Sequence, residues 1–176
     1  MLTYRTISAP EIDRRLFRSF IRRQVVTKCW RQSPQGWVIK DDPFIDDWSE
    51  EDYAFLVSCL KNTVATGGLV YGAFDDGCLK GFASVEAGLF GGEERYADLS
   101  CIHVSQDMRG RGIGRRLFEQ AKAWAREHGA RKLYISSHSA VESQAFYAAM
   151  GCTDAKVYNQ KHVEAEPFDR QLELTL

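Results

Sequence analysis

Hydrophobic and polar positions follow different periods along the first fifty residues, and each change of period predicts an element. Alternation over residues 2–7 predicts a strand, after which Ser8-Ala9-Pro10-Glu11 has the residues of a capping box with proline in the first turn. We therefore expect a helix over residues 9–25. Residues 27–48 follow neither period and are rich in tryptophan, and we expect them to be irregular.

A second helix start is marked by Ser49, an N-cap residue followed by three acids that suit the positive end of a helix dipole. Trp48 and Tyr53 flank this start at the spacing of a hydrophobic staple. The helix is expected to end at the glycine pair 67–68, because glycine commonly follows the last helical residue.

Strand and helix patterns alternate through the rest of the chain. Apolar residues at helical spacing predict a helix over residues 112–128, ended by Gly129. A second capping-box sequence, Ser139-Ala140-Val141-Glu142, predicts a helix through Met150. Strands are predicted over residues 69–74, 78–89, 95–105, 132–137, 152–160 and 169–176, the first two joined in a hairpin at Asp75-Asp76-Gly77. The order β-α-α-β-β-β-α-β-α-β-β describes one α/β (α+β) domain over residues 1–176, without internal repeats.

Composition narrows the class of protein but not its activity. The chain has 176 residues, 44% hydrophobic and 27% charged, with a formal net charge of -1, which gives no reason to expect nucleic acid as a partner. Its N-terminus lacks the apolar run of a signal peptide and no stretch has membrane-spanning length, so we expect a cytoplasmic protein without a membrane partner. Five cysteines without a CxxC pair predict neither a disulfide framework nor a metal site.

The most informative stretch is a strand that runs through a glycine-rich turn into a helix. Glycines let backbone N–H groups approach a pyrophosphate closely, and the helix start adds a partial positive charge of about half a unit. Taken alone, the turn could also be a flexible basic loop. Its spacing differs from a Walker A loop and from the dinucleotide fingerprint. The residues concerned are Ile102, His103, Val104, Arg109, Gly110, Arg111, Gly112, Ile113, Gly114, Arg115 and Arg116.

Read from Val104, this stretch is V-x-x-x-x-R-x-x-G-x-G, which resembles the acetyl-CoA-binding signature of the GNAT N-acetyltransferases. A second segment, Ser139 to Cys152, resembles the second motif of that family, a helix that carries Phe146-Tyr147 and is closed by Gly151. The resemblance implies a mixed, mostly antiparallel sheet of about seven strands flanked by about four helices. It also implies acetyl-CoA as the co-substrate and no metal.

The resemblance further implies how each motif acts. The backbone of Ile102, His103 and Val104 is expected to bind the pantetheine arm and polarise the thioester carbonyl, with Arg109, Gly110, Arg111, Gly112, Ile113, Gly114 and Arg115 around the pyrophosphate. Relatives often carry asparagine near the start of the second motif, where this chain has Ser139-Ala140. A polar contact to pantetheine then falls to Ser139, Ser143 or the backbone.

Acetyl transfer to an amine also needs proton transfer. An alkylammonium has a pKa ~3.4 units above pH 7, so presenting the neutral amine costs ~4.6 kcal/mol. Asp98 lies where the histone-acetyltransferase branch carries its general base, although a solvated strand-end carboxylate is an equal interpretation. Glu86 is the second candidate, and Ser136 stands where another branch carries a glutamate. Tyr147 resembles the general acid of the family, although a phenol near pKa 10 facing a thiol near 8.5 favours partial donation.

The acceptor is less defined. Residues 41–52 contain seven acids and no base, beside Phe44 and Trp48, and this acidic run could either recruit a cationic amine or be solvated charge at a helix start. Glu164 and Glu166 could join the same rim. Five arginines of the predicted first helix are interpreted as an exposed charged face: Arg14, Arg15, Arg18, Arg22 and Arg23.

The sequence therefore predicts a monomeric or homodimeric acyltransferase. Its expected reaction moves the acetyl group of acetyl-CoA to a primary amine of a small, cationic molecule by direct attack, with Tyr147 as general acid. Two alternatives stay open: an acetyltransferase acting on peptide or protein amines, and a non-catalytic acyl-CoA-binding sensor.

Overall fold

Seven of the nine strands form one sheet, in the order β1-β4-β5-β6-β7-β9-β8. The computed structural model describes all 176 residues. Its strands are β1 Leu2–Thr6, β2 Arg23–Ser33, β3 Gly36–Asp47, β4 Leu69–Asp75, β5 Cys78–Val85, β6 Tyr96–Val104, β7 Lys132–Ser137, β8 Thr153–Asp154 and β9 Arg170–Thr175. Its α-helices are α1 Glu50–Ala65, α2 Ile113–Glu127, α3 Val141–Ala149 and α4 Gln160–Ala165. The expectation of a mostly antiparallel, seven-stranded mixed sheet with four helices is confirmed.

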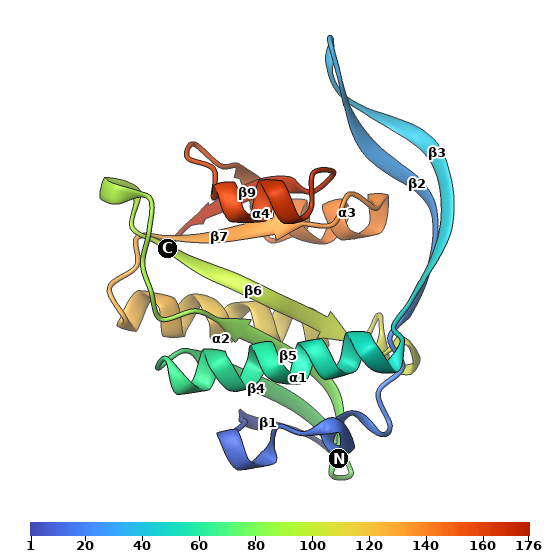
Figure 1. The fold of residues 1–176 in the computed structure, drawn as a ribbon, viewed down its shortest axis with the longest axis vertical. Coiled ribbons are helices and arrows are strands. Elements are labelled where there is room, and N and C mark those ends of the chain that lie inside the picture. Colours follow the sequence, from blue (N-terminus) through green and yellow to red (C-terminus); the bar gives the residue numbers. More distant parts are fainter.

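The single parallel pair in the sheet is β6 with β7, and it is short. The two strands pair only from Tyr96 to Asp98, against residues 132–134. Beyond Asp98, β6 continues along β5 as far as Val104, while β7 continues along β9. The strands therefore diverge in the middle of the sheet (Figure 1), and one edge of β6 is left without a strand partner.

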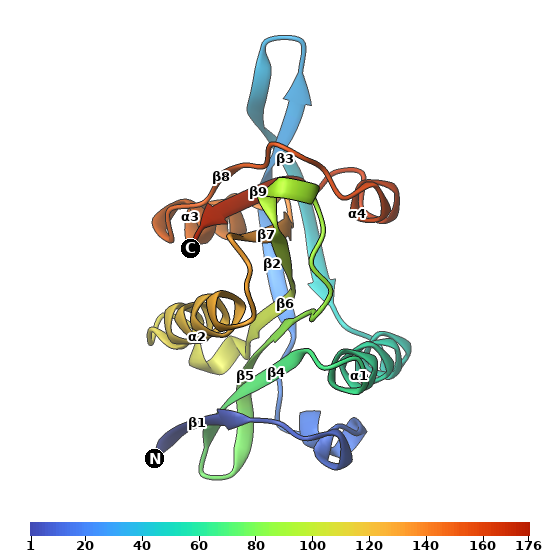
Figure 2. The ribbon, with the colours of Figure 1, turned by 90° about the vertical axis from the view of Figure 1, so that its left-hand side faces the viewer.

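Helices α1 and α2 cover opposite faces of the sheet (Figure 2). The α2 side buries Leu117 and Phe118 completely, together with the other apolar residues whose helical spacing predicted this helix. The α1 side buries Leu60 against Val70 and Phe82. Each helix thus has one apolar face toward the sheet, which is the arrangement that a two-sided α/β sheet requires. No helix combines the length and the hydrophobicity needed to cross a membrane.

The predicted helix over residues 9–25 is wrong. The capping box does form, with the Ser8 N–H donating to Glu11 Oε2 at 2.9 Å, but it opens only a single 3₁₀ turn at Ala9–Glu11. A second 3₁₀ turn covers Arg14–Phe17, and the chain then enters β2. Val25, Val26 and Thr27 are β-branched. Such residues favour a strand over a helix, which explains why this segment is part of β2.

Residues 27–48 were expected to be irregular, and this expectation is also wrong. Strands β2 and β3 pair along their length to form a two-stranded hairpin that projects from the body of the molecule (Figures 1 and 2). The backbone N–H of Trp30 donates to the Ser139 carbonyl at 2.8 Å. Val26 and Cys29 bury against Ala140. The hairpin is therefore attached to the loop between β7 and α3.

The helix start at Ser49 is confirmed. Its hydroxyl accepts from the Asp52 N–H at 3.2 Å, and the Asp52 carboxylate accepts from the Ser49 N–H at 2.7 Å, which completes a capping box. The rings of Trp48 and Tyr53 lie 5.5 Å apart, as the staple predicted.

The second predicted capping box does not form. Helix α3 begins at Val141 without a side-chain cap, because the Ser139 hydroxyl instead accepts a hydrogen bond from Arg31 Nη1 at 2.6 Å. Two strand predictions were too long: β5 ends at Val85, and residues 152–160 hold only the two-residue β8 before α4 begins.

Candidate active site

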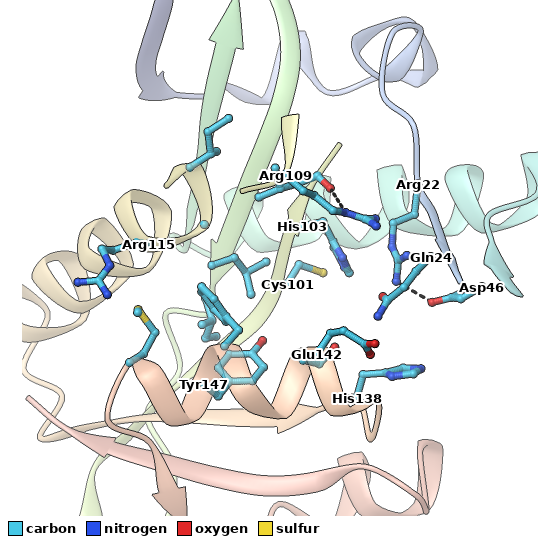
Figure 3. A pocket seen from close by; sticks show the side chains of 18 of the residues that line it. Arg22, Gln24, Asp46, Cys101, His103, Arg109, Arg115, His138, Glu142 and Tyr147 are labelled. Atoms are coloured by element: carbon cyan, nitrogen blue, oxygen red, sulfur yellow. Dashed lines mark hydrogen bonds and ion pairs between the residues drawn. The ribbon is translucent and has the colours of Figure 1, made fainter. Parts of the chain in front are cut away.

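A cavity of about 1080 Å³ opens where β6 and β7 diverge. Its walls come from the C-terminal half of β6, the glycine-rich loop, the start of α2, one face of α3 and the base of the β2–β3 hairpin. Figure 3 shows Arg115 of α2 on one side of this cavity and Arg22, Gln24 and Asp46 on the other, with Cys101 and Tyr147 between them. We call these the loop side and the hairpin side.

The loop side is made mainly of backbone. Gly110 and Gly112 have φ angles of 76° and 78°, in the left-handed region that side chains with a Cβ rarely adopt, and neither has an atom within 4 Å of where a Cβ would lie. Their surroundings are therefore open. The first backbone bond of α2 runs from the Arg116 N–H to the Gly112 carbonyl, so the preceding N–H groups have no partner inside the helix. This cradle of free N–H groups fits a pyrophosphate.

The arginines of the loop divide among different neighbours. Arg115 lines the cavity beside Gly114, whereas Arg111 is exposed and does not line it. The Arg116 guanidinium lies 4.0 Å from the centre of the Tyr4 ring, on the other side of α2's start. Arg109 lines the cavity, and its Nε donates to the Val104 carbonyl at 3.3 Å. Only part of the predicted positive charge is thus available to a pyrophosphate.

Ile102, His103 and Val104 all line the cavity, on the part of β6 that β7 no longer covers. Their backbone can therefore bind an extended ligand along this open edge, as the resemblance implies. The His103 ring lies 4.8 Å from the ring of Trp48. Burial, with Arg22 and Arg109 nearby, lowers the pKa of His103 well below its usual value, so this imidazole is neutral at pH 7.

Tyr147 projects from α3 into the cavity (Figure 3). Its ring is 9% exposed and packs 5.2 Å from Phe146 and 6.4 Å from Phe118. Burial raises the pKa of its phenol, so the hydroxyl keeps its proton and can donate it in a hydrogen bond. Ser143, one turn earlier, also lines the cavity. Ser139 does not line it, and its hydroxyl accepts a hydrogen bond from Arg31.

Cys101 lies on β6 between the two sides of the cavity (Figure 3). Burial raises the pKa of its thiol to about 12. A thiol that stays protonated at neutral pH is a weak nucleophile, so Cys101 is not suited to carry an acetyl group.

Asp98 and Glu86 lie outside this cavity, in a separate shallow hollow beside α4. Asp98 Oδ2 bonds His162 Nε2 at 2.6 Å. Glu86 Oε1 accepts from the Thr63 hydroxyl at 2.8 Å and from Ser100 at 2.7 Å. Asp98 Oδ1 is buried without a hydrogen-bond partner, but both carboxylates lie away from the cavity, and the geometry gives the predicted base role of either residue no support.

Asp169, which the sequence analysis did not single out, does line the cavity. It precedes β9 and accepts a hydrogen bond from the Ser136 hydroxyl at 3.0 Å. Burial raises the pKa of its carboxyl above the usual value. Two more carboxylates, Glu142 of α3 and Glu166 after α4, stand at the rim in exposed positions. No group of three or more His, Cys, Asp or Glu side chains is arranged to share a metal ion.

The acidic run over residues 41–52 is largely neutralised by neighbours. Five of its seven acids have partners: Asp41 pairs with Lys28, Asp42 with Arg31, Asp46 with Arg22, Glu50 with Arg14, and Asp52 caps α1 through Ser49. Asp46 and Asp52 line the cavity together with Phe44 and Trp48. Arg22, interpreted from the sequence as part of an exposed face, is only 8% exposed and lies inside the cavity wall, so that interpretation is wrong for this residue.

Solved structures with the same fold include several acetyltransferases. A nourseothricin acetyltransferase aligns over 98% of this chain and 95% of its own, with a TM-score of 0.66 and 21% identity. A presumed streptothricin acetyltransferase of Bacillus anthracis str. Ames, solved with acetyl coenzyme A, aligns over 100% and 99% with a TM-score of 0.73 and 18% identity. The PaiA N-acetyltransferase of Thermoplasma acidophilum, solved with coenzyme A, aligns over 100% and 99% with a TM-score of 0.62 and 15% identity.

Sequence comparison adds a family and one short local match. The match is 44% identity over 50 residues to N-alpha-acetyltransferase 80 of Mus musculus, which covers 28% of this chain and only 15% of that protein. The family model of the acetyltransferase (GNAT) family matches residues 24–152, from β2 through the end of the second motif. The expected acetyltransferase class is thereby confirmed. The two motifs, the diverging strands between them and this match together establish that the chain belongs to the acetyltransferase (GNAT) family.

Proposed function

We propose that this enzyme acetylates the primary amine of a small cationic molecule, which enters the cavity from the hairpin side and attacks the acetyl group directly. The observation that carries the proposal is the single cavity that contains the glycine-rich loop, the Tyr147 hydroxyl and the Asp169 carboxylate. Acetyl-CoA supplies an activated thioester when it is bound. The residues suited to hold it are the backbone of 102–104 and 110–114, with Ser143 and Arg115.

The amine must lose a proton before or during attack, and Asp169 is the group best suited to take it. Burial raises its pKa, which makes it a stronger base than an ordinary aspartate. His138 also lines the cavity, but its Nδ1 accepts the Ala140 N–H at 3.1 Å. This hydrogen bond occupies Nδ1, so that nitrogen is not free to take a proton from the amine.

Tyr147 is proposed to assist the leaving group. As the C–N bond forms and the C–S bond breaks, negative charge grows on the departing sulfur. A phenol whose pKa is raised by burial gives up its proton less readily than free tyrosine, so its main contribution is a hydrogen bond to that sulfur. Direct attack is favoured over an acetylated Cys101 because that thiol stays protonated.

The charge at the rim favours a cationic acceptor. Glu142, Glu166 and Asp169 form no ion pair, whereas the acids of the hairpin are mostly paired. Free carboxylates around an opening attract and orient a cation at a distance set by salt screening. The acetyltransferases with this fold that are named for streptothricin and nourseothricin agree with a small-molecule acceptor, while the short match to an N-alpha-acetyltransferase keeps peptide amines as the second class to test.

A panel of primary amines incubated with acetyl-CoA tests the proposal, with release of the free thiol as the readout and mass analysis of the product as confirmation. We expect polyamines and amino-bearing small molecules to release thiol in proportion to acetylated product. If only peptides with a free N-terminal amine were acetylated, the acceptor would be a peptide and not a small molecule. Tight acetyl-CoA binding without acetylation of any amine would instead identify an acyl-CoA sensor.

A further inference from the structure

The hairpin side of the cavity holds an arginine whose hydrogen-bonding capacity is not used. Arg22 is only 8% exposed, yet its Nε and Nη1 have no hydrogen-bond partner, although the side chain lines the cavity. Its one ion pair joins Nη2 to Asp46 Oδ2 at 2.6 Å. Buried donors without partners are costly, so two such N–H groups on a side chain that lines a cavity point to a ligand that accepts them when it binds.

The fold fixes this arginine in place. The Arg22 carbonyl accepts from the Trp48 N–H at 3.2 Å, and the guanidinium lies 5.1 Å from the centre of the Trp48 ring. The neighbouring Ile21 donates its N–H to Ser105 Oγ at 2.9 Å and accepts from the Gln106 N–H at 2.9 Å. The segment that bears Arg22 is therefore tied to the loop that bears Arg109.

Two guanidinium groups converge as a result. Figure 3 shows Arg22 and Arg109 close to each other and to His103, and burial together with Arg22 lowers the pKa of Arg109. His103 is neutral, and Asp52 on the same wall caps α1, so the two positive charges have only Asp46 as a paired carboxylate. The excess of positive charge, beside the buried side chain of Arg22, favours one additional anionic group.

We infer that Arg22, with Arg109, forms an oxyanion subsite that binds a carboxylate of the acceptor, so that the preferred acceptor carries both an amine and a carboxylate. Figure 3 places Arg22 across the cavity from Arg115, on the far side of Cys101 and Tyr147, and this separates it from the loop that fits the pyrophosphate. The inference rests on the proposed acetyl transfer and narrows its substrate class from cationic amines to amino acids and their derivatives.

Matched amine pairs test the subsite, because L-lysine differs from cadaverine, and L-ornithine from putrescine, only by a carboxylate. For the wild-type enzyme we expect kcat/KM to be higher for the amino acid in each pair. Arg22→Gln is expected to lower kcat/KM for the amino acid about tenfold or more, and to change the value for the diamine less than about threefold. Arg18→Gln, at an exposed arginine of the same segment that does not line the cavity, is the matched control.

Two further measurements separate a loss of the anion subsite from indirect effects of the Arg22→Gln substitution. Arg22→Gln/Asp46→Asn removes both charges of the pair, so a selective loss of the amino acid in both variants cannot come from an unpaired Asp46. Calorimetry of lysine and cadaverine on the CoA-saturated protein tests the same preference without turnover. Equal binding of both by the wild type would overturn the subsite while leaving the proposed function intact. A loss of CoA affinity in Arg22→Gln, with the amino-acid preference unchanged, would assign the anion to a phosphate of the cofactor and equally overturn the inference.

Discussion

The loop side of the cavity is formed mainly by backbone groups, and the hairpin side mainly by side chains. The loop side comes from one continuous stretch, residues 102–115, and presents backbone N–H groups and a helix start. The hairpin side comes from segments far apart in the chain, and presents the side chains of Arg22, Asp46, Glu142 and Asp169. Backbone recognition constrains glycines and helix caps, whereas side-chain recognition can change with single substitutions. We therefore expect the loop side to fix the cofactor and the hairpin side to choose the acceptor.

Gly112→Glu changes the loop side and is expected to have the largest effect of the variants, on acetyl-CoA affinity. A Cβ is strained at a φ of 78°, and the carboxylate would lie where the pyrophosphate is expected. We expect acetyl-CoA affinity to fall about 10³-fold by calorimetry, since several charge-assisted hydrogen bonds are lost together. The matched control is Gly77→Glu, because Gly77 has the same φ of 78° and open surroundings in the hairpin turn between β4 and β5. Equal losses in both variants would mean that strain, and not cofactor binding, explains the effect.

Tyr147→Phe tests the role of the Tyr147 hydroxyl, which lies between the loop side and the hairpin side. The ring and its packing stay, and only the hydroxyl is removed. Turnover is expected to fall about 10²-fold, with acetyl-CoA affinity unchanged. Tyr158→Phe removes a hydroxyl from an exposed ring and serves as the control. Full turnover of Tyr147→Phe under conditions in which the chemical step limits the rate would exclude the hydroxyl from the mechanism.

Asp169→Asn tests the proton path on the hairpin side through its pH dependence. The carboxylate is active when ionised, so the wild-type kcat/KM is expected to decrease as pH falls through the raised pKa of Asp169. The variant is expected to be tenfold or more slower near neutrality and to recover as pH approaches the pKa of the amine. Asp98→Asn is the comparison, because Asp98 lies outside the cavity. If Asp98→Asn lost this limb of the profile and Asp169→Asn kept it, the base assignment would revert to Asp98.

Glu142→Gln/Glu166→Gln is expected to have the smallest effect, because both side chains are exposed and screened by salt. KM for a cationic amine is expected to rise several-fold, with kcat unchanged and a weaker dependence of kcat/KM on salt. Glu51→Gln, an exposed acid outside the cavity, is the control. An unchanged KM and salt dependence in the double variant would remove the rim from acceptor recruitment.

The loop side of the cavity could be predicted from the sequence, whereas most of the hairpin side could not. The loop side could be predicted from the sequence of residues 104–114, because its tight backbone geometry needs glycines at fixed spacing. Tyr147 was found through its motif. Asp169 and Arg22 were missed or misinterpreted because their roles depend on contacts with Ser136 and Asp46, which lie 33 and 24 residues away in the chain. The helix predicted over residues 9–25 failed for a related reason, since residues 23–33 pair with a strand that follows them.

A structure of the enzyme with acetyl-CoA bound tests the division of the cavity most directly. We expect the pyrophosphate against the N–H groups of residues 110–114, the thioester carbonyl at the open edge of β6, and the sulfur within hydrogen-bonding reach of the Tyr147 hydroxyl. Arg22 is then expected to make no contact with the cofactor. A phosphate bound to Arg22, or a thioester beyond the reach of Tyr147, would contradict the account.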